Sequence, residues 1–210
     1  MTPSAGSRAT LHQLDEATRS LVVLSAIITG GNDRQIRDAL TRAATDIPAM
    51  WVEELLLQSY LFAGFPRALN AMREWRRLER EPLVGSAPTD IDQWRAEGEA
   101  TCAAVYGSMY DRLRANIRDL HPSLDEWMIT DGYGKVLSRP GLDLPRRELC
   151  IVAACAAAGQ DRQLHSHFHG ALNVGIDAVV IDHLLDALSE FLGADRTASA
   201  RMLWARVRGK

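Results

Sequence analysis

The chain has 210 residues with 24 basic and 27 acidic side chains, for a net charge of −3. The chain thus lacks the excess of basic residues that is typical of proteins that bind nucleic acid or anionic membranes. No apolar run reaches the roughly 18 residues of a membrane helix. The N-terminus has no apolar signal stretch, and the three cysteines include no CxxC pair. We therefore expect a cytoplasmic protein in a reducing compartment.

Apolar residues recur at helical spacing along almost the whole chain. In the first half, the pattern and its Gly and Pro boundaries predict helices over 15–28, 33–44, 48–60 and 66–82. In the second half they predict helices over 90–120 with a break near 107, and over 122–137, 145–158, 160–174, 177–190 and 195–208. No alternating strand pattern is present, so the expected fold class is all-α.

The chain contains an internal repeat. Segments 19–35 and 147–163 align at a constant offset of 128 residues, with RSL opposite REL at their start and DRQ at the end of both. We interpret the protein as two degenerate helical repeats that form a pseudo-dimer in one chain. The expected organisation is a structural N-terminal repeat over 1–82, a linker over 83–89, and a C-terminal repeat over 90–210 that carries the site.

Two ionisable residues fall in an apolar helical hairpin of the second repeat. Glu148 begins a helix that is apolar on every face, and His167 lies on the apolar stripe of the returning helix. With Gly159 at the turn, their depths differ by three residues, or about 4.5 Å at 1.5 Å per residue. Helices packed about 8–10 Å apart would let the two side chains meet. A carboxylate beside an imidazole in an apolar setting suits general acid–base chemistry.

A purely structural interpretation of this pair is also open. A Glu in the first turn of a helix interacts favourably with the helix dipole, and a lone His on an apolar stripe can be a core residue. The first repeat has Ser20 and Ala39 at the equivalent positions. Because the scaffold repeats and the ionisable pair does not, the functional interpretation is favoured.

Several motifs resemble the carboxymuconolactone decarboxylase family. They are DGYG at 131–134, LSRPGL at 137–142, REL at 147–149, QLHSHFHGALNVG at 163–175 and, in the first half, YLFAGFPRA at 60–68. The resemblance implies an all-helical fold of the AhpD-like, carboxymuconolactone-decarboxylase-like type. It also implies a homo-oligomer, a dimer or trimer, with sites between helices.

The resemblance also separates two chemistries. Peroxidase-type members of the superfamily carry a CxxC between the Glu and the His, and the two cysteine positions fall on Gln160 and Gln163 here. A dithiol reaction needs both thiols, so a peroxidase or redox function is disfavoured. The decarboxylase branch lacks these cysteines and keeps the Glu and the His, so the resemblance places this chain with that branch.

The leading hypothesis is a lyase without a cofactor that decarboxylates a small carboxylated lactone or a related acid. His167 would deliver the proton, and Glu148 would orient its imidazole and stabilise the charged ring. Arg139 is a candidate clamp for a substrate carboxylate, with a solvated turn residue as its alternative. His165 and Gln163 are further candidate substrate contacts. The remaining alternative is a non-catalytic binding or scaffold protein.

Three alternating histidines occupy the returning helix, and His165 and His169 lie four residues apart on one face. This spacing can chelate a metal ion. The sequence places no further ligand beside them, so we expect neither a metal site nor a cofactor.

Overall fold

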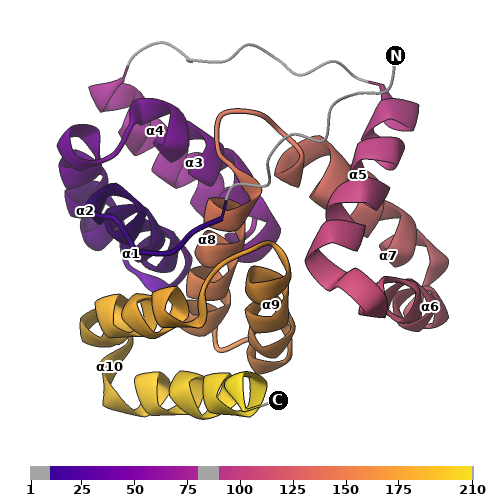
Figure 1. Ribbon diagram of the computed structural model, residues 1–210. Coiled ribbons are helices and arrows are strands. Elements are labelled where there is room, and N and C mark those ends of the chain that lie inside the picture. The colour runs from indigo at the N-terminus through magenta and orange to yellow at the C-terminus, as the bar shows by residue number, and fades with distance from the viewer. Residues whose placement is uncertain (1–9, 80–89, 210) are drawn as a thin grey trace.

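A computed structural model of the protein describes residues 10–79 and 90–209 (Figure 1). These residues form helices and no β-strand; Leu11 and Ile176 make an isolated bridge. The all-α fold class is confirmed. None of the helices in the two described ranges is long and apolar enough to cross a membrane.

The helices follow the order expected from the sequence. They are α1 (Glu16–Gly30), α2 (Asp33–Asp46), α3 (Ala49–Ala63), α4 (Phe65–Leu78), α5 (Ile91–Tyr106), η1 (Gly107–Met109), α6 (Tyr110–Leu120), α7 (Pro122–Trp127), η2 (Met128–Leu137), α8 (Leu144–Ala158), α9 (Asp161–Asn173) and α10 (Ala178–Arg208). α10 contains a non-helical Gly193, which separates the two helices expected there.

Local sequence signals set the helix boundaries. Asp15 and Asp143 accept backbone N–H bonds at the starts of α1 and α8, and Asn32 and Gln35 form a reciprocal capping box on α2. α8 ends at Gly159, whose φ of 70° is the left-handed conformation that glycine adopts without a steric cost. This turn sends α9 back along α8.

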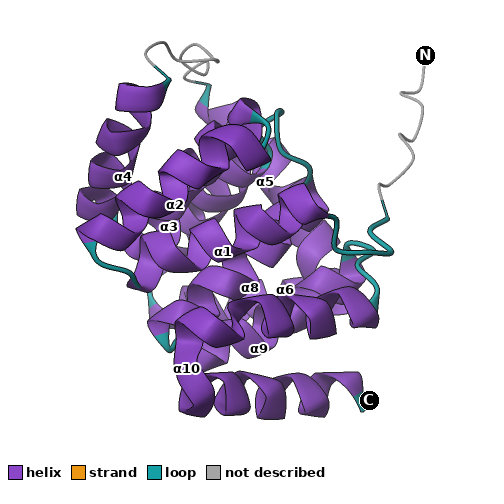
Figure 2. Ribbon diagram, turned by 90° about the vertical axis from the view of Figure 1, so that its left-hand side faces the viewer, coloured by secondary structure: helices purple, strands orange, loops and turns teal. Residues whose placement is uncertain are grey.

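α8 runs through the centre of the molecule, with α1 and α3 on one side and α9 and α10 on the other (Figures 1 and 2). From Leu149 to Ala156 its residues are almost completely buried, which explains why the sequence is apolar on every face of this helix. The Ser25 hydroxyl of α1 donates to the Cys150 carbonyl at 2.7 Å. Arg147 of α8 forms a fully buried ion pair with Glu54 of α3 at 2.7 Å.

α5 and η2 approach each other more closely than side chains would permit. A Cβ at Gly98 would overlap the Ile129 carbonyl, and one at Gly134 would overlap the Trp94 carbonyl. η2 is wound as a π-helix, a rare form that often marks functional sites. The sequence predicted a helix here but gave no signal for the wider winding.

Both segments of the proposed repeat are helical hairpins, α1–α2 and α8–α9. Their turns differ, because Gly31 is extended with a φ of −79° whereas Gly159 is left-handed. The two-repeat organisation and the division at 82 and 90 therefore stay predictions. The expected linker 83–89 lies outside the described residues.

Candidate functional site

Glu148 and His167 meet inside the α8–α9 hairpin, as the sequence predicted. His167 Nδ1 lies 2.9 Å from Glu148 Oε2. Glu148 is completely buried and His167 is 6% exposed. Glu148 is the fifth residue of α8, beyond the first turn, so it does not act as a solvent-exposed charge at the helix start.

Gly170 lets the carboxylate approach α9. It lies one turn beyond His167, and a Cβ at this position would be 2.8 Å from Glu148 Oε2 and 2.7 Å from Val105 Cγ1. A side chain there would displace one of these neighbours. The absence of a side chain at Gly170 therefore leaves the space that the Glu148 carboxylate occupies.

Glu148 has one hydrogen-bonded oxygen and one without a partner. Its Oε1 atom is buried and accepts no hydrogen bond from any residue in the described ranges. A buried polar atom without a partner destabilises the folded state, and such atoms are few in native proteins. The carboxylate therefore depends on His167 for its interaction with the rest of the site.

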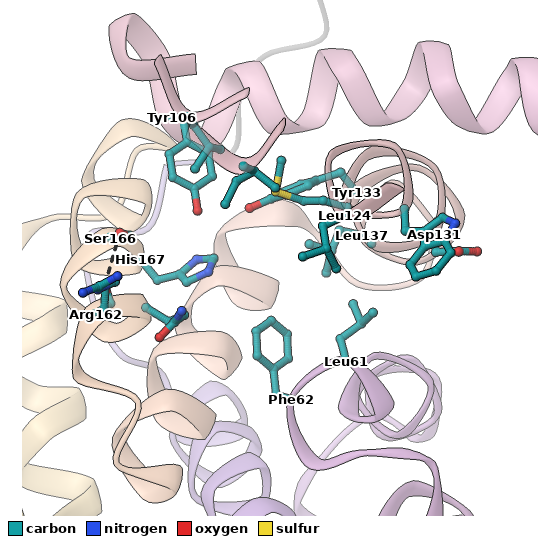
Figure 3. Close-up of a pocket in the computed structure, with 16 residues that line it drawn as sticks. Leu61, Phe62, Tyr106, Leu124, Asp131, Tyr133, Leu137, Arg162, Ser166 and His167 are labelled. Carbon is teal, nitrogen blue, oxygen red and sulfur yellow. Dashed lines mark hydrogen bonds between the residues drawn. The ribbon is translucent and has the colours of Figure 1, made fainter. Parts of the chain in front are cut away.

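His167 also lines a cavity of about 490 Å³ between α9, α3 and the α5–η2 region (Figure 3). Nδ1 faces Glu148, so Nε2 is the ring nitrogen available to a bound molecule. The rings of Phe62 and Tyr106 contact the imidazole edge-on, with centroids 6.1 and 6.3 Å away. Ligand pockets typically measure about 300–1,000 Å³, so the cavity has the size of a small-molecule site.

Tyr106 and Tyr133 place two hydroxyl groups on the cavity wall near His167 (Figure 3). Burial raises the pKa of Tyr106 to about 12 and that of Tyr133 well above its usual value, so both phenols are neutral donors. The two phenol rings contact each other edge-on, with centroids 6.3 Å apart, and the side-chain interaction with Tyr133 offsets part of the pKa shift of Tyr106.

Sequence reasoning did not select these two tyrosines. Tyr133 lies in the quoted DGYG motif, and Tyr106 directly precedes the glycine at which a helix break was expected. Both were weak signals, because a tyrosine near a helix end is commonly part of the core. Their proximity arises from the close packing of α5 on η2.

The other candidate contacts are distributed around the molecule. Gln163 lines the same cavity as His167, whereas His165 lines an adjoining hollow beside His169. Arg139 lies in a different hollow and forms a bidentate ion pair with buried Glu54. The structure therefore brings Gln163, but not Arg139, together with the Glu148–His167 pair.

Arg162 is a cavity residue that the sequence analysis did not select as a substrate contact. Arg162 lines the cavity at its solvent side, one residue before Gln163 and one turn before Ser166. Its side chain is exposed, and it forms no ion pair with any described residue. It is thus a cationic group at the mouth of the cavity that contains His167.

The three cysteines are free thiols buried in the core. Burial raises the pKa of each thiol, Cys102, Cys150 and Cys155, to about 12. Because the thiolate is the reactive form, these groups are inert near neutral pH. Among the described residues, no group of three or more His, Cys, Asp or Glu side chains is arranged to hold a metal ion.

Fold and site together define a small all-helical protein with a buried carboxylate–imidazole pair beside an apolar cavity. Residues 126–206 match the model of the carboxymuconolactone decarboxylase family. This segment carries η2, the α8–α9 hairpin and both residues of the pair, and the match confirms over these residues the resemblance drawn from the sequence.

The chain is also similar to Peroxisomal protein 2 of Schizosaccharomyces pombe. The two are 30% identical over 129 residues, which cover 59% of this chain and 60% of that protein. The match therefore spans less than two thirds of the relative's length. The relative's name refers to the peroxisome and to no reaction.

Proposed function

We propose that the protein is a carboxy-lyase that needs no cofactor and decarboxylates a small carboxylated lactone or a related unsaturated acid. The observation that carries this proposal is the buried Glu148–His167 hydrogen bond beside a cavity that the imidazole lines. The family of residues 126–206 supports the same reaction type.

The reaction has two steps. The bond between the substrate carbon and its carboxylate breaks, carbon dioxide leaves, and the electron pair moves onto the conjugated lactone carbonyl as a dienolate. His167 then donates its Nε2 proton to a carbon of the dienolate, which restores the carbonyl. Glu148 fixes the ring orientation through Nδ1 and stabilises the imidazolium that precedes the transfer. Solvent returns the proton to His167.

Tyr106 is suited to the negative charge that develops on the carbonyl oxygen. Its phenol is neutral and lines the cavity together with His167, so its hydroxyl can donate a hydrogen bond to the dienolate oxygen. Donors fixed in advance toward a developing oxyanion usually supply a large share of catalysis. The apolar wall around the cavity also strips water from the leaving carboxylate.

The test uses the full chain and a panel of γ-carboxylated lactones, including 4-carboxymuconolactone. We expect carbon dioxide release and, in heavy water, incorporation of one deuterium at the reprotonated carbon. His167→Ala should lower turnover by at least about a hundredfold, the usual contribution of a general acid or base. His183→Ala, at an exposed position on α10, is the matched control. Equal turnover in the two variants would overturn the role of His167.

The proposal extends to assembly and location. We propose a homo-oligomer, a dimer or trimer, because the family resemblance implies an assembly. We propose the cytoplasm as its location, because the three buried cysteines are unpaired, which suits a reducing compartment. The name of the Schizosaccharomyces pombe relative supports a peroxisomal location as the alternative. Light scattering of the purified protein and fractionation of the source cells distinguish these outcomes.

A further inference from the structure

The cavity beside His167 is lined mainly by large apolar side chains. Away from the imidazole, its wall is formed by Leu61, Leu113, Ile117, Leu124, Trp127 and Met128. Two of these residues remain strongly exposed, Trp127 at 58% and Leu124 at 47%. Large apolar groups that surround a hollow and stay in contact with water indicate a surface that a ligand covers.

The solvent side of the cavity near His167 is polar instead. Arg162, Gln163 and Ser166 of α9 line it; Figure 3 shows Arg162 and Ser166 side by side on this helix. The cavity has one acidic lining residue among those described, Asp131, and Lys135 pairs with it at 3.7 Å. Arg162 has no ion-pair partner in the described part of the chain. The cavity is therefore apolar along one wall and positive at its rim.

We propose that the cavity binds an acid with an extended apolar body, whose retained anionic group lies at Arg162 and whose body covers the wall formed by α6, α7 and η2. This inference rests on the proposed function, because it names the class of substrate for the same site. A bare lactone ring would leave much of the 490 Å³ empty, whereas an alkyl or aryl substituent would cover the exposed apolar groups.

The proposal predicts a dependence of affinity on the apolar length of the ligand. Calorimetry would measure binding of the unbranched alkanoates from butanoate to decanoate, below their micelle concentrations. Burial of one CH₂ group is worth about 0.8 kcal/mol, so Kd should fall about fourfold for each added methylene until the wall is covered. The tryptophan fluorescence of the protein, which includes the cavity residue Trp127, should change with the same dependence on length. A Kd that does not vary with length would overturn the proposal.

Arg162→Ala tests the anionic end. It should weaken every alkanoate by the same factor, about threefold to tenfold, because the guanidinium is solvent-exposed. The fold-change in Kd for each added methylene should stay as in the wild type. Arg34→Ala is the matched control, since Arg34 is aligned with Arg162 in the proposed repeat and is exposed. Equal affinities in the two variants would overturn the placement of the anion.

Leu124→Asn tests the apolar wall at an exposed position, where folding should be preserved. It should reduce the gain per methylene for the longer acids while leaving butanoate unchanged. Light scattering on the same variant examines a second copy of the chain as the occupant. A loss of oligomer mass together with no alkanoate binding by the wild type would overturn the proposal in favour of a subunit interface.

These measurements do not require turnover, which separates this inference from the proposed function. Length-dependent binding without decarboxylation of any lactone would retain the ligand class and refute the reaction. Decarboxylation of a bare lactone with length-independent alkanoate binding would retain the reaction and refute the ligand class. His167→Asn, which keeps a polar side chain, should bind the alkanoates with the same length dependence while losing turnover.

Discussion

Replacement of His167 by Leu should destabilise the protein strongly although Leu fills much of the same volume. Glu148 is completely buried, its Oε1 atom has no partner in the described residues, and its Oε2 atom contacts His167. His167→Leu therefore leaves a buried carboxyl group without a hydrogen-bond partner. A buried acceptor left unsatisfied in this way typically costs about 1–3 kcal/mol, and more if the group is charged.

The double variant Glu148→Leu/His167→Leu should recover most of this loss. It removes the unsatisfied carboxyl group together with its partner, and replacement of a buried ion pair by apolar side chains is often neutral or stabilising. We expect a free energy of unfolding within about 1–2 kcal/mol of the wild type, with turnover reduced at least about a hundredfold in both variants. The double variant would thus be folded and inactive.

Urea denaturation at pH 7, followed by circular dichroism, measures both variants against the exposed control His183→Leu. If the slope of the free energy of unfolding against urea concentration is unchanged, a shift of the midpoint measures a change in stability. The control should stay within about 0.5 kcal/mol of the wild type. If the single and double variants were equally stable, the unsatisfied carboxyl group of Glu148 would not destabilise the folded state, and the prediction would be wrong.

Three further predictions concern the same region. Gly170→Ala should lower turnover at least about tenfold, because the added Cβ would displace Glu148 Oε2. The control is Gly30→Ala, which should leave turnover unchanged, because the nearest neighbours of its Cβ lie at 3.4 Å. Tyr106→Phe should lower kcat by about 10²–10³ through loss of the oxyanion donor, and unchanged kcat would exclude this role. Replacement of the three buried cysteines by Ala should leave lyase turnover intact, and no variant should reduce peroxides with a dithiol; peroxide turnover by the wild type would refute this.

The Glu148–His167 contact could be predicted because it depends on local geometry. A left-handed Gly159 fixes the turn, and the rise per residue then sets the depths of both side chains in the hairpin. The apolar faces of α8 and α9 determine which sides of the two helices meet. The helix order and the all-α class could be predicted for the same reason, since helical periodicity is a local property of the sequence.

The remaining parts of the site depend on contacts between distant segments. Arg139 was a candidate clamp for a substrate carboxylate or a solvated turn residue, but its partner Glu54 lies 85 residues earlier, and no local pattern indicates that pairing. Tyr106 and Tyr133 come together through the glycine contact between α5 and η2, which requires knowledge of their relative placement. The π-helical winding of η2 likewise has no periodic signal distinct from that of an α-helix.

The backbone contact between α5 and η2 has a consequence for how the cavity can change its size. At Gly98 and Gly134 the main chain of α5 contacts the main chain of η2 directly. Rotation of side chains therefore cannot change the distance between these two helices. α6, by contrast, has no completely buried residue. A redesign for bulkier ligands should therefore leave the tyrosine side unchanged and enlarge the cavity at Leu113 and Ile117, where the helix can shift at little cost in packing.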